Sequence, residues 1–349
     1  MVSTADPAYP AGAAASPAAA AYPSRRLRRL RRTPSLRRLT AEAHVSVDDL
    51  VAPLFVRDGI AEPEPIASMP GQYQHSVPSL VAEAKRLASL GVPGLVLFGV
   101  PEPAARDAVG SGAWDPDGIA QRSLGELRSA LGDEMVIMAD TCLDEYTDHG
   151  HCGVVGTDGG VDNDATLECY QQVALAQADA GADLVAPSGM MDGQVGAIRA
   201  ALDGAGHQRV GIMAYAAKYA SALYGPFRDA VDVTIAGGGD RRTYQQDPAN
   251  RREARAEVAL DVAEGADIVM VKPALSSLDV IADVRRAVDV PVAAYQVSGE
   301  YAMVKAAAER GWIDGAAVAL EQVTAIRRAG ADIVLTYFAA ELAEHLGHR

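Results

Sequence analysis

Short apolar segments alternate with longer segments of helical pattern along most of the chain. The apolar segments are rich in Val, Ile and Leu, whereas the segments between them contain Ala, Glu and Arg with helical spacing. Near-continuous apolar strands are typical of a parallel sheet that helices cover on both faces. Eight segments are predicted to be such strands: Val51–Val56, Leu95–Val100, Met135–Asp140, Asp183–Ser188, Gly211–Ala216, Asp267–Pro273, Val290–Val297 and Asp332–Phe338.

Eight such strands favour a closed barrel over an open sheet. A (β/α)8 barrel takes about 250 residues, so a chain of 349 residues holds one barrel and an extension. Gly-Ala-Asp, followed by Leu or Ile and then Val, begins at residues 181, 265 and 330, each time between a predicted helix and a strand. No G-x-G-x-x-G motif follows the first strand, which argues against dinucleotide binding. We expect an α/β fold, a (β/α)8 TIM barrel with an N-terminal arm.

The N-terminal region differs from the barrel in composition. Residues 1–24 are rich in Ala and Pro and predict a disordered tail. Residues 25–38 hold eight arginines and no acid, although the whole chain has a net charge of −15. We therefore predict a basic arm over residues 25–45, which docks on a neighbouring acidic subunit, and a catalytic barrel over residues 46–349. The alternatives for the basic segment are a solvated tail, a nucleic-acid contact or the end of a transit peptide.

The overall composition is that of a globular enzyme, with 49% hydrophobic and 22% charged residues. No apolar run approaches the ~18 residues of a membrane span, and the N-terminal residues do not follow the pattern of a secretory signal. Three cysteines in 349 residues argue against a disulfide framework and for a reducing compartment. We expect a cytoplasmic protein that binds neither membrane nor nucleic acid.

Lysine is rare in this chain, and two of the lysines occupy special positions. Of 31 basic residues only four are lysines, and two of these, Lys218 and Lys272, lie at or just beyond the ends of predicted strands. Active sites of such barrels lie at these strand ends. Arginine stays protonated, whereas lysine becomes a nucleophile when burial or a second cation lowers its pKa. The pair predicts Schiff-base chemistry on a carbonyl substrate; the alternative is buried lysines that are paired with acids.

A loop over residues 140–153 contains thiols, carboxylates and imidazoles: Asp-Thr-Cys-Leu-Asp-Glu-Tyr-Thr-Asp-His-Gly-His-Cys-Gly. Thiolates favour zinc, and three protein ligands that leave one position open suit a catalytic or substrate-binding ion. The residues expected to converge on a metal are Cys142, Asp144 and Cys152. His149 and His151 are further candidate donors, and an acidic loop with incidental thiols is the alternative.

Arginines recur in two Gly-rich segments near the expected barrel mouth, in Tyr-Gly-Pro-Phe-Arg (224–228) and in Asp-Arg-Arg-Thr-Tyr-Gln (240–245). Guanidinium groups bind carboxylates through two parallel hydrogen bonds. We expect these segments to bind a substrate carboxylate, with surface salt bridges as the alternative.

Several motifs together resemble the porphobilinogen synthase (5-aminolevulinate dehydratase) family, from about Arg25 to the C-terminus. The most specific are Arg-Thr-Pro-Ser-Leu-Arg (32–37), Gly-His-Cys-Gly-Val (150–154), Gly-Val-Asp-Asn-Asp-Ala-Thr-Leu (160–167), Ala-Pro-Ser-Gly-Met-Met-Asp-Gly (186–193), Tyr-Gly-Pro-Phe-Arg (224–228), Asn-Arg-Arg-Glu-Ala (250–254), Met-Val-Lys-Pro (270–273) and Tyr-Gln-Val-Ser-Gly-Glu (295–300).

The resemblance implies a hydro-lyase of tetrapyrrole (heme) biosynthesis, which condenses two molecules of 5-aminolevulinate to porphobilinogen with loss of two waters. It implies that Lys272 forms a Schiff base with one substrate and that Lys218 engages the other. It further implies that Asp140 lies near the reacting amine. Two sets of residues would hold the substrate carboxylates: Ser298 and Tyr337 for the first, and Arg228, Arg241 and Gln245 for the second.

The resemblance also implies metal ions and an assembly. Zinc-dependent members have three cysteines where this chain has Cys142, Asp144 and Cys152, and other members replace all three. The carboxylate of Asp144 is expected to weaken zinc binding or admit magnesium. Glu257 matches an allosteric magnesium position, and family members form homo-octamers through their arms. In Ala-Tyr-Ala-Ala-Lys (214–218), alanines replace the family's usual serines.

Two further functions compete with porphobilinogen synthesis. An aldolase-type lyase would use the same imine chemistry. A nucleic-acid-binding protein would act through the arginine-rich arm, but the acidic barrel argues against it.

Overall fold

The computed structural model describes residues 22–236 and 239–347. The chain divides into two units, residues 1–44 and 45–349. The first unit holds a 3-10 helix, Leu27–Arg31, and helix α1, Pro34–Leu39, which begins with the Thr33 hydroxyl accepting a hydrogen bond from Leu36 N. No residue of either helix is buried. Most of the predicted tail, residues 1–21, lies outside the described residues.

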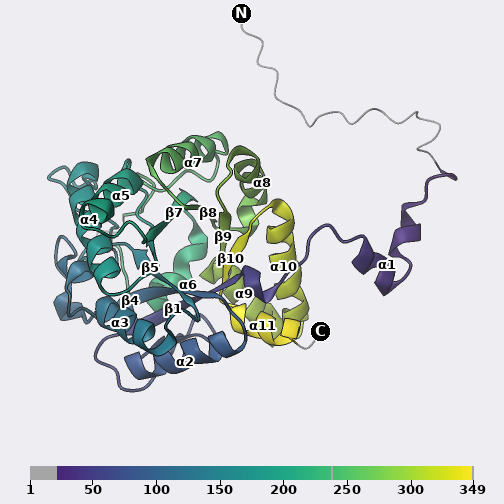
Figure 1. Ribbon diagram of the computed structural model, residues 1–349, viewed down its shortest axis with the longest axis horizontal. Helices are drawn as coiled ribbons and strands as arrows, with labels where there is room; N and C mark the ends of the chain where they lie inside the picture. Colours follow the sequence, from purple (N-terminus) through teal and green to yellow (C-terminus); the bar gives the residue numbers. More distant parts are fainter. Residues whose placement is uncertain (1–21, 237–238, 348–349) are drawn as a thin grey trace, which may run out of the picture. The chain divides into compact units, whose positions relative to one another are not determined.

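The second unit is a closed barrel of parallel strands surrounded by helices (Figure 1). Each of eight strands pairs with the next in the chain, and the last pairs with the first through Leu50 opposite Val334. The fold prediction is therefore confirmed. The strands are β1 (Leu50–Arg57), β4 (Gly94–Val100), β5 (Val136–Thr141), β6 (Leu184–Pro187), β7 (Gly211–Lys218), β8 (Ile268–Lys272), β9 (Val292–Gln296) and β10 (Ile333–Thr336).

Helices connect these strands and form the outer layer in Figure 1. Two of them, α4 and α10, begin at aspartates, Asp162 and Asp314, whose carboxylates accept backbone hydrogen bonds of the first turn. The helices are α2 (Val77–Ser89), α3 (Ile119–Leu131), α4 (Asn163–Asp179), α5 (Gln194–Gly204), α6 (Gly225–Ala230), α7 (Arg252–Glu264), α8 (Leu278–Ala287), α9 (Ser298–Glu309), α10 (Gly315–Ala329) and α11 (Ala339–Gly347). None of the described helices combines the length and apolar character that a membrane span requires.

The repeated Gly-Ala-Asp motif has the same structural role at each of its three positions. Its glycines follow helices α4, α7 and α10 and have φ of +103°, +109° and +120°, a region that favours glycine. Each aspartate then accepts a hydrogen bond from the neighbouring preceding strand. The pairs are Ile137 N to Asp183 at 2.8 Å, Ile212 N to Asp267 at 2.8 Å and Val292 N to Asp332 at 3.0 Å. The motif thus ends a helix and aligns two adjacent strands.

Two short strands were not predicted from the sequence. They are β2 (Glu64–Pro65) and β3 (Tyr73–His75), which pair with each other antiparallel, while β3 also continues the sheet beside β1. Strands of two and three residues show too few alternating positions to stand out by periodicity.

Close packing around Gly299 provides a test of the fold at the start of α9. A Cβ atom at Gly299 would lie 2.5 Å from the Leu223 carbonyl oxygen and 2.8 Å from its Cα, so backbone would have to move. We expect Gly299→Ala to lower the free energy of unfolding by about 2 kcal/mol. Gly125 is the control, because it is an exposed position inside α3 where an added Cβ would have no atom within 4 Å. Gly125→Ala should raise stability by about 1 kcal/mol. Denaturant unfolding of both variants measures this, and equal effects would contradict it.

Candidate functional site

The C-terminal ends of the barrel strands carry most of the residues that were predicted from the sequence. Lys218 and Lys272 are the last residues of β7 and β8, and Asp140 lies near the end of β5. Ser298 and Tyr337 follow β9 and β10 by one or two residues and are buried. The barrel therefore directs side chains from five strands towards the same mouth.

The two lysines lie opposite each other in adjacent strands, each with 5% of its surface exposed. Their alignment depends on an irregularity in β7 between Ala214 and Ala217, where the register with β8 shifts by one residue. A shift of one residue reverses the face to which every later side chain points. The irregular segment is the Ala-Tyr-Ala-Ala-Lys stretch, and it brings Lys218 rather than Ala217 beside Lys272. The Lys218 ammonium donates a hydrogen bond to the Ser188 carbonyl at 2.5 Å.

Lys272 is surrounded by aromatic rings. Its Nζ lies 4.3 Å from the ring centre of Tyr295, 5.1 Å from that of Tyr215 and 5.2 Å from those of Tyr224 and Phe227. Ring faces favour the protonated amine, but burial and the nearby Lys218 charge together lower the pKa of Lys272 to about 7. A large fraction of this amine is therefore neutral, and nucleophilic, near neutral pH.

Asp140 is an acid that lines the same small cavity as the two lysines. Its Oδ2 accepts a hydrogen bond from the Ser188 hydroxyl at 3.2 Å, and its buried Oδ1 has no hydrogen-bond partner within the described part of the chain. Burial raises the pKa of Asp140 to about 6, against the charge of Lys218. The carboxyl can therefore exchange a proton near neutral pH.

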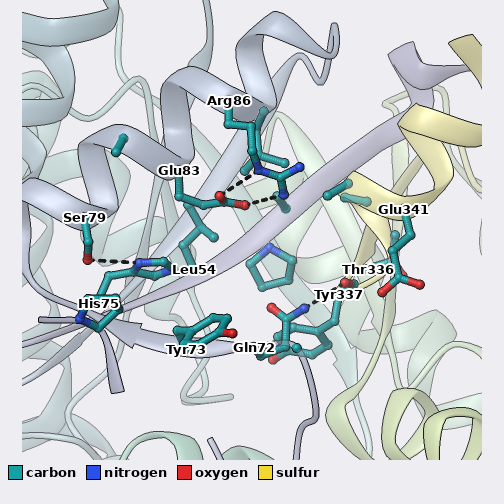
Figure 2. A pocket seen from close by; sticks show the side chains of 18 residues that line it. Leu54, Gln72, Tyr73, His75, Ser79, Glu83, Arg86, Thr336, Tyr337 and Glu341 are labelled. Carbon is teal, nitrogen blue, oxygen red and sulfur yellow. Dashed lines mark hydrogen bonds and ion pairs between the residues drawn. The ribbon is translucent and has the colours of Figure 1, made fainter. Parts of the chain in front are cut away.

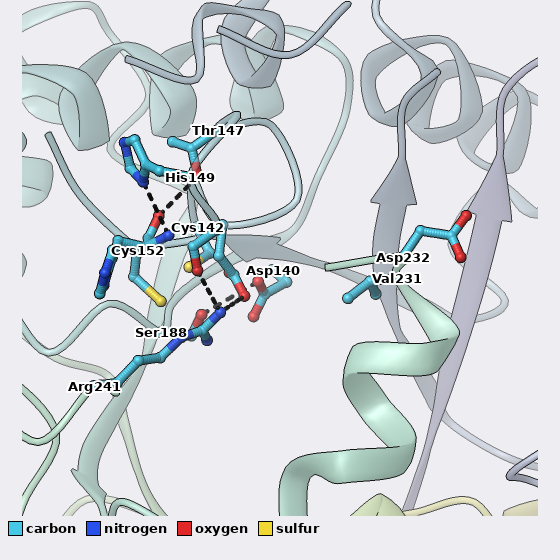
Figure 3. Close-up of polar contacts among 12 residues, drawn as sticks. Asp140, Cys142, Thr147, His149, Cys152, Ser188, Val231, Asp232 and Arg241 are labelled. Atoms are coloured by element: carbon cyan, nitrogen blue, oxygen red, sulfur yellow. Dashed lines mark hydrogen bonds and ion pairs between the residues drawn. The ribbon is translucent and has the colours of Figure 1, made fainter. Parts of the chain in front are cut away.

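Cys142, Asp144 and Cys152 bring their side-chain donor atoms within 4.8 Å of one another, all in buried positions. Figure 3 shows Cys142 and Cys152 on the same side of the view as Arg241 and Asp140. Tyr170 contacts both cysteines, because its hydroxyl lies 3.0 Å from the Cys152 backbone carbonyl and 3.5 Å from Cys142 Sγ. A hydrogen bond from Cys142 lowers the pKa of Cys152, which favours one thiolate. Two sulfur donors and one carboxylate oxygen fit a divalent cation such as zinc.

The histidines of this loop have other partners. His149 Nε2 lies 3.2 Å from the Ala108 carbonyl, and His151 Nδ1 lies 3.1 Å from the Tyr244 hydroxyl. Neither imidazole belongs to the donor group that the described residues form. Their role as further metal donors therefore stays a prediction that this donor group does not support.

Asp144 also forms a buried ion pair, which the sequence did not indicate. Arg241 Nη2 donates to Asp144 Oδ2 at 2.7 Å and to the Gly150 carbonyl at 2.8 Å. The two side chains are 8% and 4% exposed. Burial acts to raise the pKa of Asp144, but the charges of Arg241 and Lys218 outweigh it and hold that pKa well below its usual range. Asp144 is thus an anion with a partner already in place.

Arg228, Arg241 and Gln245 line a cavity of about 430 Å³. Each has a buried nitrogen without a hydrogen-bond partner among the described residues: Nε of both arginines and Nε2 of the glutamine. Unpartnered buried donors are costly, so three of them on residues that line one cavity indicate a site for an anionic acceptor. A carboxylate fits this site.

The cavity beside the two lysines is much smaller than the cavity lined by Arg228, Arg241 and Gln245. The cavity that the two lysines share with Asp140, Arg228 and Phe227 has a volume of about 20 Å³, which holds about one water molecule. Side chains of the segment that contains α6 form part of its wall. A substrate can therefore reach the amines only if side chains of this wall move.

Ser298 and Tyr337 border Lys272 indirectly. The Tyr337 hydroxyl lies 2.9 Å from that of Tyr295, whose ring contacts Lys272. The Ser298 hydroxyl donates to the Leu223 carbonyl at 3.3 Å, next to Tyr224. The Tyr337 hydroxyl is thus linked to Lys272 through the Tyr295 ring, and the Ser298 hydroxyl binds the residue that precedes Tyr224.

Glu257 is separate from these residues. It is half-buried on helix α7 in the outer layer, where burial and then the neighbouring acids Asp192, Glu253 and Glu264 raise its pKa. This acidic group is distinct from the lysine pair and the thiols.

Sequence reasoning missed Glu145 and did not predict that four rings surround Lys272. Glu145 is 3% exposed and lines the small cavity; burial, Asp144 and Asp140 raise its pKa well above the usual range. The only sequence signal for Glu145 was its place beside Asp144. For the rings, it was the density of tyrosines near both lysines.

A cavity of about 540 Å³ lies outside the barrel against β1, between α2 and α11 (Figure 2). Its wall includes Leu54, His75 and Glu83, and Glu83 pairs with Arg86 at 2.8 Å. Neither barrel-mouth lysine and no thiol lines it. Of the candidate residues described above only Tyr337 lines this cavity, so the lysine chemistry belongs to the barrel mouth.

Comparison with known proteins agrees with this geometry. A family model, "Delta-aminolevulinic acid dehydratase", matches residues 24–345. The protein of that name from Streptomyces coelicolor is 57% identical over 324 residues, which cover 93% of this chain and 98% of the relative. The Mycobacterium tuberculosis H37Rv protein of the same name is 58% identical over 321 residues, covering 92% and 97%.

A solved structure is also similar. The delta-aminolevulinic acid dehydratase (porphobilinogen synthase) of Toxoplasma gondii ME49, in complex with the reaction product porphobilinogen, superposes with a TM-score of 0.90 at 44% identity, covering 92% of this chain and 91% of that one. On the evidence of this match, the family model and the relatives, the chain belongs to the delta-aminolevulinic acid dehydratase family.

Proposed function

We propose that this protein is a porphobilinogen synthase, a hydro-lyase that condenses two molecules of 5-aminolevulinate to porphobilinogen with loss of two waters. The observation that carries the proposal is the buried, register-aligned pair Lys218 and Lys272, in which Lys272 has a pKa of about 7. Two amines side by side match a reaction that joins two copies of one keto substrate. The family membership supports the same activity.

Lys272 would begin the reaction as a neutral amine. Its nitrogen adds to the ketone carbon of one substrate, and loss of water gives an imine. The imine withdraws electrons and so acidifies the adjacent carbon for carbon–carbon bond formation. Lys218 engages the ketone of the second substrate, and Asp140 exchanges protons with the reacting amine. Holding both substrates at one barrel mouth supplies the orientation that the condensation needs.

The substrate carboxylates would be held at two places. The unpartnered nitrogens of Arg228, Arg241 and Gln245 would donate to the carboxylate of the substrate at Lys218. The hydroxyls of Ser298 and Tyr337 would donate to the carboxylate of the substrate at Lys272. Placing an arginine-rich site on one side only is consistent with an asymmetric condensation of two identical molecules.

We assign a divalent cation to Cys142, Asp144 and Cys152, and zinc is our first candidate for this ion. When bound, such an ion polarises a substrate group as a Lewis acid. One carboxylate in place of a third thiolate lowers the preference for zinc and admits harder ions such as magnesium. Glu257, with its acidic neighbours, is our candidate for an allosteric magnesium site.

The assembly and location belong to the same proposal. A homo-octamer formed through the arm of residues 25–45 would use the eight arginines of this segment against acidic barrels. Three buried cysteines without disulfides agree with a cytoplasmic enzyme.

Trapping the imine tests the role of Lys272. With 5-aminolevulinate and borohydride, we expect a covalent adduct on Lys272, and porphobilinogen in a colour assay without borohydride. Lys272→Arg should form no adduct at this position and lose roughly 10³-fold or more in kcat, because arginine is not a nucleophile. Lys85→Arg, at an exposed position in α2, is the matched control. An adduct without porphobilinogen would instead indicate an aldolase-type lyase.

The lysine pair also predicts a pH dependence. Because the neutral amine reacts, the rate of adduct formation should rise as pH increases through about 7 and level off above it. Lys218→Met removes a positive charge that lowers the pKa of Lys272, so the midpoint should move to higher pH. Burial is the larger cause of the lowered pKa, so the midpoint should stay below 10.5, the ordinary lysine value. A midpoint that stays in place would contradict the coupling of the two amines.

Metal analysis tests the thiol site. We expect the purified protein to contain a divalent ion that exhaustive chelation removes together with activity, and Cys142→Ser to lower its affinity by at least about 10-fold. Full activity in a demonstrably metal-free protein would reject the assignment.

A further inference from the structure

Glu300 is a buried carboxylate that the proposed function leaves without a role. It lies in the first turn of α9, two residues after Ser298, and 1% of its surface is exposed. Its Oε2 accepts a hydrogen bond from Val297 N at 2.7 Å, and its Oε1 accepts one from Leu275 N at 2.8 Å. The two oxygens of one side chain therefore bind two different segments of the barrel mouth.

Each of these segments carries a residue of the proposed active site. Val297 lies at the exit of β9 and directly precedes Ser298, which we assign to the carboxylate of the first substrate. Leu275 lies at the exit of β8, three positions after Lys272, which we assign to the imine. Glu300 thus bridges the chain beside the reactive amine and the chain beside the carboxylate donor.

The bridge lies where the pairing of the two strands has ended. The ladder between β8 and β9 reaches Val271 opposite Ala294. Beyond this pair, Ala274 N donates to the Tyr295 carbonyl at 2.9 Å, and the carboxylate of Glu300 makes the next connection along the chain. The relative position of the two strand exits therefore depends on a side chain as well as on the sheet.

The bridge is rigid because neither partner has access to water. Burial raises the pKa of Glu300 to about 7, while the backbone N–H groups of Val297 and of residues 274–276 act against this rise by stabilising the carboxylate. Hydrogen bonds to an ionised acceptor are shorter and stronger than those between neutral groups. Breaking one of them would leave a buried N–H group without its acceptor, which is costly.

We propose that Glu300 is a positioning residue for the first substrate, because it fixes the distance between the Lys272 amine and the Ser298 hydroxyl. In 5-aminolevulinate a carbon chain of fixed length separates the ketone from the carboxylate, so this distance selects keto acids of that length. The inference rests on the proposed function, which takes Lys272 to form the imine and Ser298 to bind the carboxylate.

Levulinate and pentan-2-one test this role in the whole protein, because they share a ketone and a carbon chain but only levulinate carries a carboxylate. Borohydride trapping, with the adduct on Lys272 quantified by peptide mass spectrometry, gives a rate for each ketone at equal low concentration. We expect wild-type protein to trap levulinate about 100-fold faster than pentan-2-one, since only the acid gains hydrogen bonds at its far end.

Glu300→Gln keeps the size of the side chain, but an amide offers one acceptor oxygen and one NH₂ donor, so one segment loses its acceptor. We expect the preference for levulinate to fall about 10-fold, while the pentan-2-one rate stays within about 2-fold of wild type. Glu309→Gln makes the same chemical change at an exposed position of α9 and should leave both rates unchanged.

A double variant shows whether Glu300 acts through Ser298. Ser298→Ala removes the hydroxyl and should lower the preference for levulinate. If Glu300 acts by positioning this hydroxyl, the double variant Ser298→Ala with Glu300→Gln should show the same preference as Ser298→Ala alone, because the two effects are not additive. A further loss in the double variant would overturn the positioning role.

The remaining outcomes are also distinct. Glu300→Gln protein that keeps the wild-type preference, or that traps both ketones more slowly by the same factor, overturns the positioning role alone. Wild-type protein that traps no levulinate on Lys272, or that shows no preference for the acid, overturns the proposed function. If Glu300→Gln does not fold, Glu300→Asp decides: its carboxylate is too short to reach both segments, and an unchanged preference overturns the positioning role.

Discussion

The arrangement of the barrel mouth depends on holding two lysine amines side by side where water is nearly excluded. Desolvation and mutual repulsion both disfavour two protonated amines in such a place. The protein resolves this differently for each lysine. Lys218 donates to the Ser188 carbonyl, which satisfies a charged donor. Lys272 lies among aromatic rings, and burial brings its pKa to about 7, so that it can remain neutral. One amine is thereby ready to react, while its neighbour supplies positive charge.

The strands of the barrel were predictable from the sequence, whereas the alignment of the two lysines was not. The eight strands were predictable because they are buried on both faces and read as unbroken apolar runs. The chain has only four lysines, and two of them, Lys218 and Lys272, could be recognised because they lie at the ends of predicted strands. Their alignment was not predictable, since it depends on the register shift in β7, which no alternation of residues reveals. Ala214 and Ala217 lie at the two ends of that shift.

The ion pair between Asp144 and Arg241 was hidden for a different reason. The two residues are 97 positions apart, and each had a sufficient interpretation by itself, one as a ligand and one as a carboxylate binder. Sequence reasoning assigns a residue one role at a time, whereas a buried charge must be compensated in every state of the site. Similarly, Glu145 had no motif of its own, and only its burial beside two other carboxyl groups distinguishes it.

These charges together explain how so small a cavity can be stable before substrate enters. Arg241 neutralises Asp144, and burial beside Asp144 and Asp140 raises the pKa of Glu145, which favours its uncharged form. Asp140, with a pKa of about 6, and the lysine pair retain protons that can be redistributed. A 5-aminolevulinate molecule carries one amine and one carboxylate, so its entry adds no net charge to this cluster. Binding therefore need not create unpaired charges, which are costly in a water-poor site.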